Sequence, residues 1–121
     1  MAYKRYVVEF GMGADLHGGD LTKAAKKAVK DALSHCCLCG LQDILALSNP
    51  DAAMKVHVKI GCTNPEKVDK AEVLTMVPVG QAEVEVVEGG INEVGLYVGR
   101  FGEGNLIEIV NAVLTVWVDV P

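Results

Sequence analysis

The sequence predicts an α/β (α+β) domain whose helices pack on one face of a mixed sheet. Half of the residues are hydrophobic but only 5% are aromatic, so Val, Ile, Leu and Ala must build the core. That mixture suits helices packed on a sheet. Segments with alternating polarity, typical of strands, are interspersed with segments whose apolar spacing is close to 3.6. Their order, β-α-β-α-β-β, predicts two crossovers followed by a hairpin-like pair. The 121 residues should form a single domain, residues 1–121.

The first strand and the first helix have the clearest patterns. Residues 3–10 are rich in aromatic and β-branched residues, which favours a strand. The glycines at 11, 13, 18 and 19 are expected to break it. Asp20 is a plausible N-cap for a helix from Leu21 to about Leu38, and Gly40 is expected to stop that helix.

The second half of the chain is predicted to contain three more strands. Residues 41–48 fit either a short helix or a strand, and 49–51 fit a turn. The strict alternation over 54–62 predicts a half-buried strand. Asn64 and Pro65 fit the cap and first position of a helix that runs to about Met76. Strands over 81–88 and 107–120 follow, separated by a glycine-rich excursion over 89–104.

The charge and composition limit the classes of partner that we expect. The net charge is −5, with no continuous basic stretch, so nucleic acid is not an expected partner. No apolar run has the length of a membrane span and no export signal is visible, so we expect no membrane partner and a cytoplasmic location. The hydrophobic fraction is high for so small a domain, which predicts a homo-oligomer. The four cysteines, whose spacing differs from that of zinc knuckles, are expected to be buried, inert thiols at positions 36, 37, 39 and 62.

The segment Gly-Met-Gly-Ala-Asp-Leu-His-Gly at 11–18, called here the signature segment, holds the strongest functional candidates. Gly11 and Gly13 permit a tight turn or the close approach of a ligand. In an extended segment Asp15 and His17 would point the same way, as an acid/base pair or the start of a metal site. A structural interpretation is also open: the glycines shape a strand-to-helix connection, Asp15 caps a turn and His17 bonds to backbone.

Residues outside this segment extend the candidate site. Gly18 and Gly19 lead into a helix start whose N–H groups can hold an anion. His57 lies on the polar side of its strand with Lys59. If that strand neighbours the first, His57 completes a divalent-metal site with Asp15 and His17; otherwise it is a solvent-facing histidine. Arg100 can clamp a carboxylate or phosphate, and Glu103 can equally neutralise it.

Two resemblances add to these predictions. The signature segment, with His-Val-Lys-Ile-Gly at 57–61 and Asn-Pro-Glu-Lys-Val-Asp at 64–69, resembles a small conserved-hypothetical (Lin-type) family with a GxGxDxHG signature and no assigned activity. The element order is similar to that of YjgF and chorismate-mutase-like proteins. That similarity implies a trimer that binds small polar metabolites between subunits, although the cationic residues expected for a dicarboxylate substrate are not evident.

The sequence therefore predicts an uncharacterised small-molecule enzyme or metabolite-binding protein, with acid/base or metal-assisted chemistry on a small polar substrate. The alternative is a non-catalytic homo-oligomeric protein in which the signature segment binds an anion or serves assembly. No cofactor is required by the sequence, and a divalent metal would fit the same side chains. The catalytic and metal-ligand candidates are Asp15, His17 and His57; the ligand-binding candidates are Gly11, Gly13, Gly18, Gly19, Lys59 and Arg100.

Overall fold

The structure is a computed structural model that describes residues 2–102 and 104–120. Its strands form one sheet in the order β1-β5-β2-β3, and β4 pairs with β5 beyond the end of β2. β2 and β3 run parallel and the other pairs are antiparallel, so the sheet is mixed. The strands are β1 (Ala2–Asp15), β2 (Met54–Cys62), β3 (Gln81–Glu88), β4 (Ile91–Val94) and β5 (Leu106–Val120).

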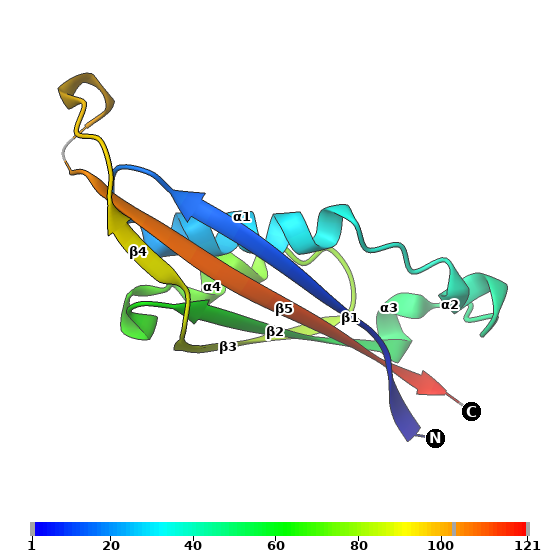
Figure 1. The fold of residues 1–121 in the computed structure, drawn as a ribbon. Helices are drawn as coiled ribbons and strands as arrows, with labels where there is room; N and C mark the ends of the chain where they lie inside the picture. Colours follow the sequence, from blue (N-terminus) through cyan, green and yellow to red (C-terminus); the bar gives the residue numbers. More distant parts are fainter. Residues whose placement is uncertain (1, 103, 121) are drawn as a thin grey trace.

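The two helices α1 (Leu21–Ser34) and α4 (Lys70–Leu74) lie on one side of the sheet (Figure 1). Two single-turn helices, α2 (Gly40–Asp43) and α3 (Pro50–Ala53), lie at the end of the sheet where both termini are found. A 3-10 turn, η2 (Gly99–Phe101), lies in an arm that projects beyond the opposite end. The predicted fold class, a mixed α/β fold with helices on one face, is confirmed.

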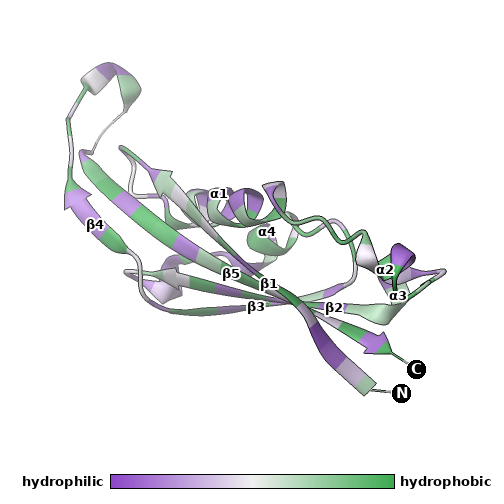
Figure 2. Ribbon diagram, turned by 45° about the vertical axis from the view of Figure 1, so that its right-hand side comes forward, coloured by the Kyte–Doolittle hydropathy of each residue, from purple (hydrophilic) through white to green (hydrophobic). Residues whose placement is uncertain are grey.

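The core lies between α1 and the inward-facing positions of β2 and β5. Val58 and Ile60 on β2 and Val110 on β5 are fully buried there against α1 residues such as Val29. Hydrophilic and hydrophobic bands alternate along β5 in Figure 2, as expected for a strand with one covered face. The alternation predicted for residues 54–62 is confirmed, which places Lys55, His57 and Lys59 on the other face of the sheet.

The expectation that glycines end the first strand after residue 10 is wrong for Gly11 and Gly13. β1 continues through both to Asp15, in register with β5. A Cβ atom at Gly11 would overlap the carbonyl oxygen of Ala28, and one at Gly13 would overlap that of Ala24. The absent side chains therefore let the α1 backbone pack directly on β1.

α1 begins where predicted but ends earlier. The Asp20 carboxylate accepts a hydrogen bond from the Lys23 N–H at 3.0 Å, which confirms the predicted N-cap. The helix ends at Ser34 rather than Leu38. The Ser34 hydroxyl donates to the Asp31 carbonyl at 2.6 Å, and the Cys36 N–H donates back to Leu33. These bonds close the last turn, and Gly40 begins α2 instead of stopping α1.

The helix predicted over 64–76 is two separate pieces. The 3-10 turn η1 (Pro65–Lys67) comes first, and Asn64 makes no side-chain capping bond. Asp69 then starts α4: its carboxylate accepts from the N–H groups of Ala71 and Glu72. The Asp69 N–H itself donates to the Thr22 hydroxyl of α1 at 2.9 Å, which fixes this break against the first helix.

The three remaining segments, for which the sequence predicted a short element, a turn and an excursion, each contain a short helix or strand. Residues 41–48 begin as helix α2 and contain no strand. The turn predicted at 49–51 is the start of α3, whose cap Asn49 accepts from the Ala52 N–H. The excursion over 89–104 contains strand β4 as well as η2. None of the helices in the described ranges has the length and apolarity needed to cross a bilayer.

Candidate functional site

A cavity of about 470 Å³ lies at the end of the sheet where β1 and β2 finish and β5 starts. Its lining combines one carboxylate, one imidazole, one ammonium group and several amide side chains, together with the second half of the signature segment and its neighbour Gly19. The lining residues are His17, Gly18, Gly19, Leu21, Thr63, Asn64, Lys67, Asn92, Gly104, Asn105, Leu106 and Glu108.

Glu108 is the buried charged group of this cavity. It is the second inward-facing position of β5 and is only 5% exposed. The Thr63 hydroxyl lies 2.9 and 3.0 Å from its two carboxylate oxygens. A single hydroxyl proton can serve only part of the hydrogen-bonding capacity of a carboxylate. Burial of a carboxylate costs free energy unless its oxygens are hydrogen-bonded, so this environment favours a further donor.

Asp15 lies directly across the ladder from Glu108 and is 6% exposed. Its Oδ2 atom accepts a hydrogen bond from the Asp20 N–H at 2.8 Å, and the Lys23 Nζ lies 3.9 Å from Oδ1. These contacts close the turn between β1 and α1, as the structural interpretation of the sequence anticipated. Asp15 is not among the residues that line the cavity.

His17 lies in the bend after β1 rather than in an extended segment. Its side chain therefore does not repeat the direction of Asp15, and no hydrogen bond joins the two in this structure. The Nδ1 atom is buried without a hydrogen-bond partner among the described residues. The ring lies 5.5 Å from that of Phe101, which belongs to the projecting arm. His17 is thus the member of the predicted pair that reaches the cavity.

His57 is not brought to Asp15 and His17. Asp15 pairs with Glu108 on β5, whereas His57 pairs with Thr115, seven residues further along the same strand. That separation is about 23 Å at the usual rise of a strand. Among the residues that the structure describes, no three His, Cys, Asp or Glu side chains form a group suited to a metal ion.

Of the other predicted ligand-binding residues, some line the cavity and the rest lie elsewhere. Gly18 and Gly19 line the cavity, while Gly11 and Gly13 face α1. Lys59 is exposed on the opposite face of the sheet from α1. Arg100 lies in η2, outside the cavity lining, with its guanidinium 5.0 Å from the centre of the Phe101 ring. Glu103, its expected neutralising partner, lies outside the described residues.

The cysteines differ from the expectation of four buried thiols. Cys62 is fully buried at the end of β2 and Cys36 is partly buried, but Cys37 and Cys39 are exposed. Cys36, Cys37 and Cys39 follow the end of α1 at Ser34, so they lie in the connection to α2 rather than on the buried side of the helix. Burial raises the pKa of the Cys62 thiol, the Glu108 carboxylate raises it further, and a hydrogen bond with the backbone of Asn64 acts in the opposite direction.

Sequence reasoning missed most of the polar lining, including Glu108, Thr63, Lys67 and the three asparagines. For Glu108 a signal was present. Val110, Ala112, Leu114, Val116 and Val118 alternate along the last strand, and the same period of two extends back to position 108. A carboxylate on the buried face of a strand is unusual and indicates a function or a partner.

The sequence matches the model of a protein family over residues 5–116, and the family is described as "Conserved hypothetical protein (Lin0512_fam)". None of the curated proteins matches this chain. Among solved structures, it is similar to an FtsZ-like protein of unknown function from Nostoc punctiforme PCC 73102. The two are 34% identical, with a TM-score of 0.82 and 98% of each chain covered. The predicted family is confirmed: this chain belongs to the Lin0512 family of conserved hypothetical proteins.

Proposed function

We propose that the cavity binds a small polar molecule and that Glu108 is the main acceptor for a donor group of this ligand. One observation carries the proposal: a carboxylate that is 5% exposed lines the cavity and has the Thr63 hydroxyl as its hydrogen-bond donor. An ionised carboxylate offers about four acceptor positions. An N–H, O–H or ammonium group of a ligand would use those that remain.

The rest of the lining supports a ligand that carries an acceptor or a negative charge as well. Lys67 provides an ammonium group, and Asn64, Asn92 and Asn105 provide amides that both donate and accept. A volume of about 470 Å³ lies within the usual range of roughly 300–1,000 Å³ for small-molecule sites. A zwitterionic molecule, with an ammonium group for Glu108 and a carboxylate for Lys67, fits this distribution of charge.

The same residues support proton transfer. Glu108 can accept a proton from the bound molecule as a general base, and His17 can carry a proton between the cavity and solvent. In this proposal Asp15 acts only as the group that holds the turn beneath the cavity. The catalytic pair inferred from the signature segment is thus replaced by Glu108 and His17.

The test is a protein-observed NMR titration with ω-amino acids of increasing length: glycine, β-alanine and 4-aminobutyrate. Malonate, which has negative groups only, is titrated alongside. We expect saturable shifts of the backbone amides around residues 17–19, 63–67 and 104–106 with at least one amino acid. Glu108→Gln should weaken that binding by about 10-fold or more, because it removes a charge-assisted hydrogen bond.

The matched control is Glu88→Gln, which removes an exposed carboxylate outside the cavity. It should bind the amino acid as the wild type does. If no amino acid shifts these amides, or if Glu108→Gln binds equally well, the proposal is wrong. Binding of malonate with no dependence on Glu108 would instead support the alternative of a plain anion site.

A further inference from the structure

The sheet has one face covered by α1 and α4 and a second face on which the described residues place no helix (Figure 1). We propose that this open face is the surface through which copies of this chain associate. The open face consists of the outward-facing side chains of β1 to β5. The proposal concerns a region distinct from the cavity, since Glu108 and its neighbours lie on the covered side.

One part of the open face, called here the apolar pad, exposes large hydrophobic side chains on adjacent strands. Phe10 on β1 is 66% exposed and pairs with Val113 on β5. Ile91 on β4 is also 66% exposed and pairs with Ile109 on the other edge of β5. The pad, which spans three neighbouring strands, consists of Val8, Phe10, Met12, Ile91, Ile109 and Val113.

The residue pattern of the apolar pad differs from that of a sheet face in contact with water. Antiparallel sheets often have a solvated face, but such a face alternates polar residues outward. β2 and β3 follow that rule, with Lys55, His57 and Lys59 beside Glu83 and Glu85. β1 breaks it, because its outward positions 8, 10 and 12 are Val, Phe and Met. An apolar patch of this kind, which here surrounds the exposed side chain of Asn111 between Ile109 and Val113, marks an interaction surface.

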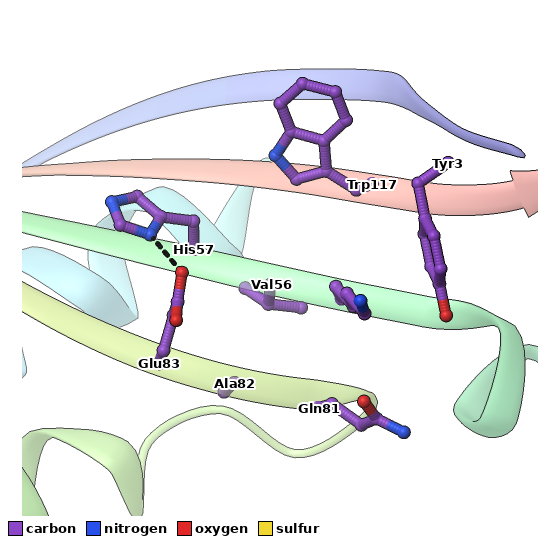
Figure 3. A pocket seen from close by; sticks show the side chains of 8 residues that line it. Tyr3, Val56, His57, Gln81, Ala82, Glu83 and Trp117 are labelled. Atoms are coloured by element: carbon purple, nitrogen blue, oxygen red, sulfur yellow. Dashed lines mark hydrogen bonds and ion pairs between the residues drawn. The ribbon is translucent and has the colours of Figure 1, made fainter.

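The outward-facing side chains of β2 and β3, called here the charged strip, carry equal numbers of positive and negative charges, which suits contact between identical surfaces. The strip consists of Lys55, His57, Lys59, Glu83 and Glu85. His57 Nδ1 lies 2.8 Å from Glu83 (Figure 3) and Nε2 lies 3.0 Å from Glu85. Lys59 lies opposite Glu85 in the register of β2 and β3. The two lysines and two glutamates of this strip cancel, although the whole chain carries −5. Two copies can therefore meet on this strip without the repulsion that like charges would cause.

The size of the open face also fits a second copy. With strands about 4.8 Å apart and about 3.3 Å per residue, the five strands present roughly 800 Å² on one side. A stable interface of ordinary size buries about 800 Å² per partner. Two such faces packed together form a sandwich with a shared core, the usual way to cover an open sheet. A second copy supplies an identical apolar pad, so each pad covers the other.

The test compares assembly masses by native mass spectrometry and by light scattering after gel filtration. Phe10→Asp and Ile91→Asp each place a charge in the apolar pad, and both sites are exposed enough for the single chain to fold. The matched control is Ile44→Asp, since Ile44 is 80% exposed but lies after α2, away from the open face. Circular dichroism checks that each variant is folded.

We expect the wild type and Ile44→Asp to have at least twice the chain mass, and both pad variants to have the mass of one chain. A wild type that is a monomer at micromolar concentration would overturn the proposal, and would leave the pad to a different kind of partner. Assembly of both folded pad variants at the wild-type mass would overturn it equally. The number of copies follows from the wild-type mass.

Discussion

The two halves of the signature segment differ in what they do. Residues 11–15 belong to β1 and lie under α1, where Gly11 and Gly13 admit the helix backbone and Asp15 holds the following turn. Residues 16–18 follow the strand as a bend and a bridge to Leu106, and His17 and Gly18 line the cavity. A single sequence motif can therefore combine a packing device with part of a site, and its residues cannot all be assigned to chemistry.

The largest expected loss of stability comes from substitution in residues 11–15, the half of the segment that packs under α1. Gly13→Ala should destabilise the protein by about 3 kcal/mol, because the added methyl group would overlap backbone atoms of α1 that cannot move without shifting the helix. The melting temperature should fall by roughly 10 °C or more. Calorimetry or thermal circular dichroism measures the change.

The control for this prediction is Gly18→Ala in the other half of the segment. A Cβ atom there would lie 3.4 Å from the Asp15 carboxylate, close to ordinary contact. Its cost should stay below about 1 kcal/mol. Equal losses in the two variants would contradict the division of the segment into two halves.

A smaller effect is expected at the boundary between the halves. Asp15→Asn should cost about 1–2 kcal/mol, since it weakens a buried, charge-assisted bond to the Asp20 N–H. Asp31→Asn is the matched control: its carboxylate also accepts a backbone N–H, that of Met12 at 2.9 Å, but it is exposed. Chemical denaturation should show the larger loss for Asp15. A larger loss for Asp31 would remove the structural role assigned to Asp15.

The smallest expected effect is a difference in chemical labelling between thiols at the two ends of the molecule. Cys62 immediately precedes Thr63 at the cavity, whereas Cys37 and Cys39 are exposed after α1. We expect a maleimide reagent to label Cys37 and Cys39 in the native protein and Cys62 only after unfolding, as peptide mass spectrometry can determine. Rapid native labelling of Cys62 would mean that the cavity opens at its base.

The raised pKa of Cys62 adds a pH dependence with a definite sign. The folded protein holds this proton more tightly than the unfolded chain, whose thiol titrates at the ordinary value of 9.0. The stabilising contribution is complete below that pH and is lost as the pH rises through the folded pKa. The free energy of unfolding should therefore fall more steeply above pH 9.0 in the wild type than in Cys62→Ala.

Local patterns were enough to predict several elements. The alternation over residues 54–62 identified β2 and the side to which each of its residues points, and Asp20 identified the start of α1. These predictions are confirmed because strand alternation and capping depend on residues within one turn or a few positions. The break before α4 is fixed by a contact that local patterns do not contain, the bond from the Asp69 N–H to the Thr22 hydroxyl. The early end of α1 was missed although it rests on local bonds, those of Ser34 with Asp31 and of Cys36 with Leu33, because the apolar spacing does not reveal them.

The candidate site was predicted only in part, for a similar reason. The signature segment identified His17, Gly18 and Gly19. Thr63, Lys67, Asn92 and Glu108 come from other segments, and they meet His17 only because β5 lies between β1 and β2 and also pairs with β4. The register of β1 and β2 on β5 separates His57 from His17, because Asp15 lies opposite Glu108 and His57 lies opposite Thr115.

The sequence by itself determined the fold class, the family and the periodic elements, because composition and periodicity are local properties of the chain. The tertiary structure alone decided which polar residues share a cavity, that Gly11 and Gly13 serve helix packing, and which face of the sheet stays open. Those features depend on strand order and on the distance between α1 and β1. Both follow from the packing of segments far apart in sequence, and no local pattern encodes them.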